Sequence, residues 1–276
     1  MSASFPVSGM RLVLAAAAVV LSAGTLAAGV ATASAAPRVT APPPVDHQLC
    51  YAASSAGFKI PAGVRLIDQF SPNGFVPAIT RKVMLHCNPT VKILPAGKVT
   101  PITNPNAHLA CFKITPATSQ PTPTVAVTNQ FGTATLIPGQ PNLMCVPSWK
   151  SLGGPPGKTP KTPPRLNHFT CYPVKLAPGS APYNPPPVML QDEFAAAPVN
   201  AQVSRVPAEL CLPTEKILPS GKAFPIINPA QHLLCFPVTP TPVISPVFDE
   251  NQFGTRPITI SQTRWLCAPS TKRVTG

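Results

Sequence analysis

The chain has 276 residues, of which 41 are proline, and a formal net charge of +13. This much proline argues against a helical protein, because proline disrupts helix interiors, while 44% hydrophobic residues and patterned cysteines argue against a wholly disordered chain. The basic charge favours attraction to anionic surfaces, but the sequence contains no motif typical of specific nucleic-acid recognition.

The N-terminal region has the pattern of a secretory signal peptide. Arg11 precedes an apolar run over 12–30, and Ala33-Ser34-Ala35 supplies a small-residue cleavage site. The alternative is a single membrane anchor, since the run approaches the roughly 20 residues that span a bilayer. We expect a signal peptide over 1–35, because alanine and glycine dilute the run and a Pro-rich segment, 36–44, follows directly. The mature protein is then extracellular, without a stable membrane span.

From residue 45 onward, one pattern of three motifs occurs four times, which is typical of a repeat architecture. The first motif is His-x-x-Cys-aromatic: His47, Cys50, Tyr51; His108, Cys111, Phe112; His168, Cys171, Tyr172; His232, Cys235, Phe236. The middle motif is Asp/Asn-Gln/Glu-Phe: Asp68-Gln69-Phe70, Asn129-Gln130-Phe131, Asp192-Glu193-Phe194, Asn251-Gln252-Phe253. The closing motif is Cys-x-Pro, beginning at Cys87, Cys145, Cys211 and Cys267.

The spacing indicates that a block of two repeats was duplicated. The interval between the middle phenylalanine and the closing cysteine is longer in repeats one and three, and shorter in repeats two and four: Phe70–Cys87 and Phe194–Cys211, against Phe131–Cys145 and Phe253–Cys267. We therefore predict two domains of ordinary size, 45–150 and 167–276, each built from a repeat pair. Segment 151–166, rich in proline, glycine and lysine, is expected to be an exposed linker.

The apolar stretches of the mature chain are short and are interrupted by proline, glycine or asparagine. Examples are 82–85, 124–127, 257–260 and 263–267. This rhythm predicts an all-β fold: two tandem, disulfide-stapled small sandwich or barrel domains with long Pro-rich loops.

Eight cysteines in an exported chain predict a disulfide framework. Four cysteines in each domain allow three connectivities. We favour pairing inside each repeat: Cys50 with Cys87, Cys111 with Cys145, Cys171 with Cys211, and Cys235 with Cys267. The alternative nests the bridges, joining Cys87 to Cys111 and Cys50 to Cys145.

The repeated histidines raise a metal hypothesis, because imidazole and thiolate are good ligands for zinc or copper. Disulfides would remove the thiolates, and residues three apart on a strand point to opposite faces. We therefore expect each histidine to bond a nearby backbone group beside the motif aromatic, with no metal and no cofactor. Metal handling by His47, His108, His168 and His232 stays as an alternative. His86 interrupts the closing pattern and is interpreted as a surface or edge substitution.

The middle motif predicts a turn rather than a catalytic carboxylate. Asn replaces Asp in alternate repeats, so a required proton transfer is not repeated, whereas both side chains can accept a local backbone hydrogen bond. No constellation typical of a hydrolase, a metalloprotease or a phosphate-binding enzyme is present. We expect no enzymatic activity.

The motifs together resemble an uncharacterised domain family of secreted bacterial proteins, over residues 45–272. The carrying motifs are His-x-x-Cys-Tyr/Phe, Asp/Asn-Gln-Phe, and a closing Leu-Cys-x-Pro-x-x-Lys, which appears as Leu210–Lys216 and Leu266–Lys272 and, with Met144 inserted, as Leu143–Lys150. The resemblance implies no known activity, cofactor or catalytic residue.

The sequence therefore predicts a non-enzymatic exported module that has a structural or binding role, at the cell surface or outside the cell. The first alternative is an electrostatic binder of anionic cell-wall polymers, since 45–150 carries a formal charge of +6 against +2 for 166–276. Another exported protein is a further candidate partner.

Overall fold

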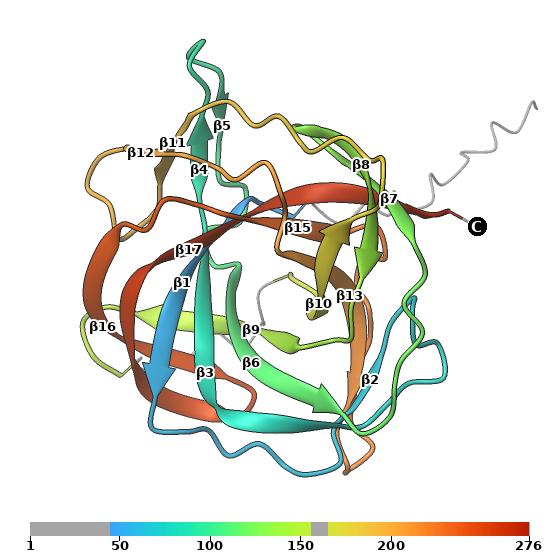
Figure 1. The fold of residues 1–276 in the computed structure, drawn as a ribbon. Coiled ribbons are helices and arrows are strands. Elements are labelled where there is room, and N and C mark those ends of the chain that lie inside the picture. The colour runs from blue at the N-terminus through green and yellow to red at the C-terminus, as the bar shows by residue number, and fades with distance from the viewer. Residues whose placement is uncertain (1–44, 156–164, 276) are drawn as a thin grey trace, which may run out of the picture. The chain divides into compact units, whose positions relative to one another are not determined.

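Eight long antiparallel strands close into a ring at the centre of the computed structural model, which describes residues 45–155 and 165–275 (Figure 1). Each ring strand pairs with the next, and the last pairs with the first. In ring order they are β1 (Gln48–Ser55), β3 (Pro77–Pro89), β6 (His108–Pro116), β9 (Leu143–Ser151), β10 (His168–Leu176), β13 (Glu209–Ile217), β15 (His232–Pro237) and β17 (Gly254–Val274). The all-β fold class is confirmed, since the described residues form strands and no helix.

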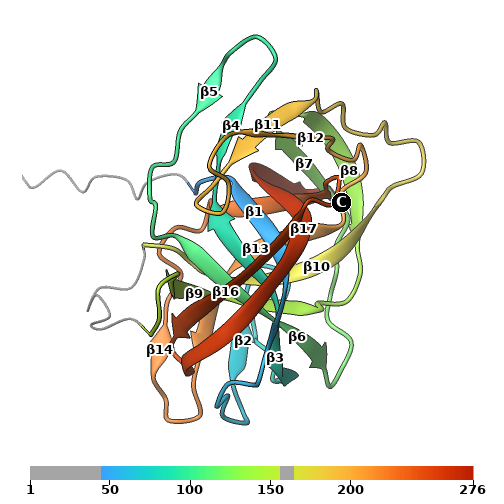
Figure 2. The ribbon, with the colours of Figure 1, turned by 90° about the vertical axis from the view of Figure 1, so that its left-hand side faces the viewer.

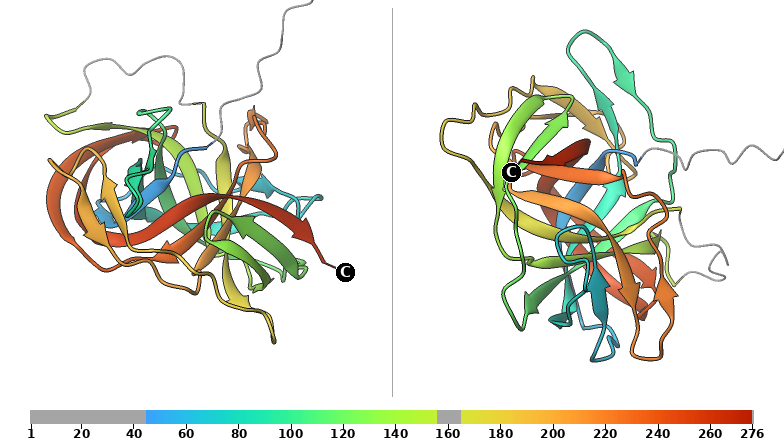
Figure 3. Two further views of the ribbon diagram at one scale, coloured as in Figure 1. Left: turned by 90° about the horizontal axis from the view of Figure 1, so that it is seen from above. Right: turned by 90° about the vertical axis from the view of Figure 1, so that its right-hand side faces the viewer.

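Nine shorter or flanking strands surround the ring. They are β2 (Arg65–Ile67), β4 (Val91–Ile93), β5 (Val99–Thr100), β7 (Val125–Asn129), β8 (Gly132–Pro138), β11 (Val188–Gln191), β12 (Val199–Ala201), β14 (Ala223–Phe224) and β16 (Pro242–Asn251). Strands β12, β11, β4 and β5 form a separate four-stranded sheet. The β4–β5 hairpin projects from the ring in Figures 2 and 3, and β16 lies along β17 in Figure 2.

Each repeat contributes two neighbouring ring strands, one carrying the first motif and one carrying the closing motif. Because side chains alternate along a strand, the cysteines of both motifs point to the inner face of the ring, while the histidine and the aromatic residue point outward. The inner face is a small apolar cluster of cysteines, leucines and Phe169. The outer face is the larger core, where the flanking strands and loops cover the motif aromatics.

The two repeat pairs share this one ring, which corrects the prediction of separate domains over 45–150 and 167–276. Strand β1 of the first pair bonds β17 of the second, and β9 bonds β10, so that Leu49 faces Leu266 and Phe169 faces Cys145. One repeat pair supplies half a ring with two open edges, and unpaired edges favour pairing with further strands. The described residues accordingly belong to a single compact unit.

The middle motifs lie at the tips of turns, and the turn differs between long and short repeats. In the short repeats the motif occupies a tight hairpin, with Asn129 opposite Gly132 and Asn251 opposite Gly254. Both glycines have positive φ values, +125° and +111°, which side-chain-bearing residues rarely adopt. In the long repeats no such hairpin forms, and the extra residues make a wider turn beginning at Asp68 or Asp192.

Some predictions concern parts of the chain outside the described residues. The signal peptide, 1–35, the Pro-rich segment, 36–44, and most of the expected linker, 156–164, are among them. No helix within 45–155 or 165–275 has the length and apolar character needed to cross a membrane.

Candidate functional site

The four disulfides each join the two ring strands of one repeat, which is the favoured pairing. They are Cys50–Cys87, Cys111–Cys145, Cys171–Cys211 and Cys235–Cys267. In every case the two cysteines face each other directly across antiparallel strands. No free cysteine remains in the described residues. Four disulfides indicate an oxidising environment.

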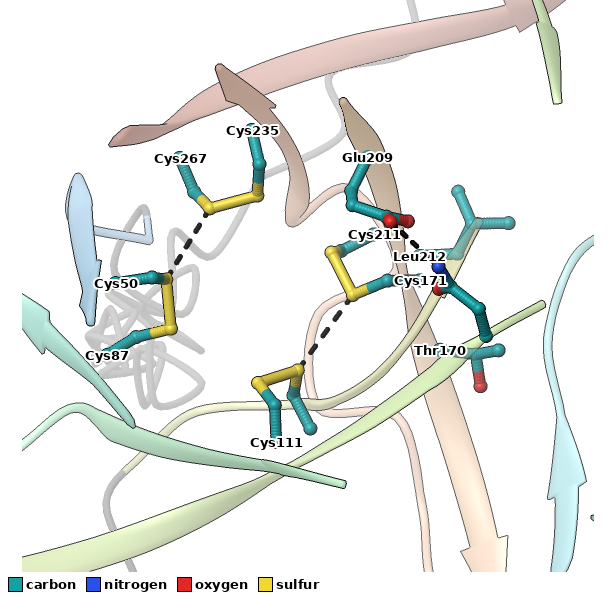
Figure 4. Close-up of a disulfide and its surroundings, with 12 residues drawn as sticks. Cys50, Cys87, Cys111, Thr170, Cys171, Glu209, Cys211, Leu212, Cys235 and Cys267 are labelled. Carbon is teal, nitrogen blue, oxygen red and sulfur yellow. Dashed lines mark hydrogen bonds between the residues drawn. A yellow bond between two sulfur atoms is a disulfide. The ribbon is translucent and has the colours of Figure 1, made fainter. Parts of the chain in front are cut away.

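The disulfides face one another inside the ring (Figure 4). The Sγ atoms of Cys50 and Cys267 are 3.7 Å apart, and those of Cys145 and Cys171 are 3.9 Å apart. No cysteine is more than 5% exposed. The sulfurs are therefore bonded and enclosed, and they offer no thiolate to a metal ion.

The middle motif closes its turn with the bond that its sequence predicts. The Asp or Asn side chain accepts a hydrogen bond from the backbone N–H of the motif phenylalanine, at 2.8 Å for Asp68, Asn129 and Asn251. The distance is 3.0 Å for Asp192. Both residue types make this bond, so it does not explain why aspartate and asparagine alternate.

The alternation of Asp and Asn is explained by packing across the ring. Each motif phenylalanine packs edge-on against the first-motif aromatic residue two repeats away: Phe194 with Tyr51, Phe70 with Tyr172, Phe131 with Phe236, and Phe253 with Phe112. Where that residue is tyrosine, its hydroxyl donates to the motif aspartate: Tyr51 to Asp192 at 2.8 Å, and Tyr172 to Asp68 at 2.7 Å. Where it is phenylalanine there is no hydroxyl, and the motif carries asparagine.

Each first-motif histidine lies in a cluster with a lysine of its own repeat and the Gln or Glu of the next repeat's middle motif. We call these the histidine clusters and name each by its histidine. Their members are His47, Lys92 and Gln130; His108, Lys150 and Glu193; His168, Lys216 and Gln252; His232, Lys272 and Gln69. Each lysine also lies over the phenylalanine that follows the Gln or Glu.

The His47 cluster illustrates the common arrangement. The Gln130 side-chain amide donates to His47 Nε2 at 2.7 Å and accepts from the Lys92 ammonium through its oxygen. The amide thus satisfies two buried groups at once, as buried polar groups require. In the His168 cluster, Lys216 Nζ donates directly to His168 Nε2 at 3.1 Å. These side-chain partners replace the nearby backbone group expected for the histidines, although His232 also approaches the Ala230 carbonyl, at 3.2 Å.

Burial shifts the pKa values of the histidines and lysines of these clusters in the direction that favours their neutral forms. It lowers the pKa of His47 and of His232 to about 4, with a smaller effect of the neighbouring lysine, and it lowers the pKa of His168 well below its ordinary value. Burial likewise lowers the pKa of Lys92 to about 8 and that of Lys216 to about 6.

The His108 cluster departs from the other three because its middle motif supplies glutamate. The Glu193 carboxylate forms an ion pair with Lys150 and lies 3.5 Å from His108 Nε2. Asn88 extends the network: its Oδ1 accepts from Lys150 at 3.0 Å and from His108 Nδ1 at 3.1 Å, and its amide donates to Asp192 at 2.9 Å. Burial, Lys150 and His86 lower the pKa of His108 well below its ordinary value.

His86 belongs to this same region, and its interpretation as a surface or edge substitution is wrong. The residue is fully buried, its Nδ1 lies 3.1 Å from an oxygen of the buried Asp249, and its ring stacks on that of His108 at 5.8 Å. Neither ring nitrogen makes a hydrogen bond of good geometry. One region therefore collects two histidines, a lysine and three acids.

The four histidines of the metal hypothesis lie in four different clusters. Each of His47, His108, His168 and His232 contacts a different Gln or Glu. Across 45–155 and 165–275, no group of three or more His, Cys, Asp or Glu residues is placed to hold a metal ion.

Glu209 is a buried acid that sequence reasoning missed. Burial raises its pKa to about 7, Oε1 accepts from the Asn142 amide at 2.8 Å, and Oε2 has no hydrogen-bond partner. Figure 4 shows it beside Cys171 and Cys211 at the inner face of the ring. The other repeats have Leu85, Leu143 and Trp265 at this position. A polar residue where the repeats otherwise carry apolar ones was the available signal.

Burial of acids leaves the surface strongly basic. Five of the eight acidic residues are buried: Asp46, Asp68, Asp192, Glu209 and Asp249. Among the described residues, Glu193 is the one exposed acid. The exposed basic residues are Lys59, Arg65, Arg81, Lys82, Lys98, Lys113, Arg165, Lys175, Arg205, Lys222, Arg264 and Arg273. The positive charge of the chain is therefore concentrated at the surface with little local compensation.

Residues 108–269 match a repeat family of unknown function, DUF7450, and the chain belongs to this family. The match covers repeats two to four, including the closing motifs. No curated protein matches the chain, and no solved structure does. The family agrees with the repeat architecture and carries no activity with it.

Proposed function

We propose that this protein is a non-enzymatic exported module that acts by binding, at the cell surface or in the extracellular medium. The observation that carries the proposal is the fourfold use of the same set of polar residues. Histidine, lysine and Gln or Glu occupy one packing position in every repeat, and they join consecutive repeats around the ring. An active site needs its catalytic group once. A contact that connects consecutive repeats is needed four times, once at each boundary between repeats.

The disulfides and clusters together support a rigid module. Each disulfide fixes the two strands of one repeat, and each histidine cluster fixes one repeat to the next. Closing loops of these lengths stabilises a fold by about 3–4 kcal/mol per bridge. A rigid surface loses little conformational entropy on binding, which favours recognition by a preformed face.

The alternative function, electrostatic binding of anionic cell-wall polymers, is supported by the distribution of exposed charge. The described parts of the chain contain twelve exposed basic residues and one exposed acid. An excess of exposed positive charge attracts a polyanion over distances of about a Debye length. A metal-handling role would instead require the four histidines as ligands, and these histidines already contact other side chains within the clusters.

Binding of the purified mature protein to isolated cell walls tests this proposal. We expect the protein to co-sediment with walls carrying anionic polymers, and to release most of its bound fraction between 50 and 500 mM salt, as is expected for screened charges (~3-fold shorter Debye length). Walls stripped of their anionic polymers serve as the control. Turnover of a wall component, or stoichiometric zinc or copper in the oxidised protein, would overturn the proposal.

A further inference from the structure

We propose that a groove between the loop after β1 and the beginning of β3 binds an anionic polysaccharide. The groove has a volume of about 270 Å³ and is lined by 60–63, 77–79 and Arg81. This inference deepens the electrostatic form of the proposed function by naming the site and the ligand class.

The backbone around the groove is fixed by local contacts. The N–H of Phe58 donates to the Arg81 carbonyl at 2.7 Å, which ties the loop after β1 to β3. Gly63 has a φ of +82°, and its position lies against Pro219 from the third repeat. The groove is therefore preformed, so a ligand does not have to order it.

The rim of the groove is basic and unpaired. Arg81 lines the groove, Lys59 directly precedes the lining residue Ile60 on the other tied segment, and Lys82 follows Arg81 on β3. All three basic residues are exposed, and no side chain of the described residues forms an ion pair with any of them. No acid lines the groove. An anionic group placed there gains attraction without displacing an internal partner.

The lining between these charges is apolar, which distinguishes the possible polyanions. Pro61, Ala62 and Ala78 are exposed apolar lining residues onto which the C–H faces of sugar rings can pack. No aromatic side chain lines the groove, so bases of a single-stranded nucleic acid have no stacking platform. The exposed apolar lining residues are small, and none is a large aromatic or aliphatic side chain that could insert into a lipid surface. A polysaccharide bearing carboxylates fits both features, because arginine bonds carboxylates in a bidentate manner.

Two matched charge reversals test the site with polygalacturonate as the probe. Arg81→Glu/Lys59→Glu changes the groove, and Lys175→Glu/Arg273→Glu makes the same change of charge beside the β7–β8 hairpin. We expect the groove variant to bind about tenfold more weakly and the control variant about twofold more weakly, since local charges act more strongly than distant ones. Thermal unfolding of both oxidised variants checks that the fold is retained.

A third variant separates the groove from the charge. Ala78 lines the groove and is exposed, so Ala78→Trp fills the groove while leaving every charge in place. We expect this variant to bind polygalacturonate at least about fivefold more weakly, because the sugar rings lose their apolar contact area. Neutral dextran should not bind to any variant.

The outcomes separate the site from the function. Equal losses in the two charge reversals, or unchanged binding by Ala78→Trp, would overturn the groove while leaving electrostatic binding in place. Tighter binding to single-stranded DNA or to anionic lipid vesicles than to polygalacturonate would overturn the ligand class. Absence of binding to polygalacturonate and to cell walls alike would overturn both the groove and the electrostatic function.

Discussion

The His108 and His47 clusters occupy equivalent positions in the ring, but they connect consecutive repeats through different chemistry. In the His47 cluster, a neutral amide bridges Lys92 and His47 through its two ends. In the His108 cluster, Glu193 pairs with Lys150, and Asn88, Asp192, His86 and Asp249 join the network. The geometry of the repeat therefore specifies a polar bridge at this position, and it leaves the charge of that bridge free to vary.

The difference between the clusters predicts how strongly each depends on its acids. Removal of one member of a buried charge pair leaves the other charge unpaired, whereas an amide bridge contains no pair of opposite charges to break. Substitutions at equivalent positions should accordingly have unequal effects.

The largest difference is expected at the first residue of the middle motif. Asp192→Ala removes the acceptor for Tyr51, Asn88 and the backbone of Phe194, and should lower the free energy of unfolding by about 3 kcal/mol. Asn129→Ala removes mainly one backbone bond in the neighbouring repeat and should cost about 1 kcal/mol. Denaturant unfolding with the disulfides intact measures both values. Equal losses of unfolding free energy would show that the two motifs contribute equally to stability and would contradict this prediction.

The lysines give the next contrast. Lys150→Met leaves Glu193, Asp192 and Asp249 without their shared cation, and should cost about 2 kcal/mol. Lys92→Met removes a buried ammonium that has no carboxylate partner in its cluster, so its effect should stay within about 1 kcal/mol of zero. Denaturant unfolding measures both changes. A larger loss of unfolding free energy in Lys92→Met than in Lys150→Met would contradict the expected difference between the two clusters.

Local features of this fold could be predicted from the sequence, and long-range features could not. The bond closing each middle-motif turn joins residues two apart, so Asp68 and Asn129 revealed it directly. The pairing of Cys50 with Cys87 followed from the repeat unit. Closure of the ring depends on β1 meeting β17, whose paired residues are separated by most of the chain. Repeat spacing alone is equally consistent with two small domains.

The histidine partners were hidden for a related reason. Gln130 and His47 belong to different repeats, and the two residues become neighbours only when consecutive repeats pack around the ring. His86 was misread because a histidine at a position that is apolar in the other repeats suggests exposure. Its buried partner, Asp249, lies in the fourth repeat. The alternation of Tyr and Phe with Asp and Asn was the sequence signal for cross-ring packing.

A smaller effect, of opposite sign, is expected at Lys216. Burial lowers its pKa from 10.5 to about 6, so the unfolded chain binds more protons than the folded one between these values. This group therefore lowers stability progressively as the pH falls from about 10 toward 6. Lys216→Met should remove that dependence and raise the free energy of unfolding by about 1 kcal/mol at pH 7. Unfolding measured from pH 6 to 10 tests it, and a variant with the parent's pH slope would contradict it.

The smallest effect is expected for a substitution that converts one type of cluster into the other. Gln130→Glu gives the His47 cluster the carboxylate that Glu193 supplies to the His108 cluster, and Glu193→Gln is the reverse change. The new negative charge should raise the pKa of His47 from about 4 toward its ordinary value of 6.5, which NMR titration of the imidazole measures. In the parent protein the unfolded chain binds the extra proton between these values, so stability is lost as the pH falls from about 6.5 to 4. The variant should lose less over that window and gain no more than about 0.5 kcal/mol at pH 7, because Gln130 is exposed. An unchanged His47 pKa would show that the side chain at position 130 does not govern the protonation of His47.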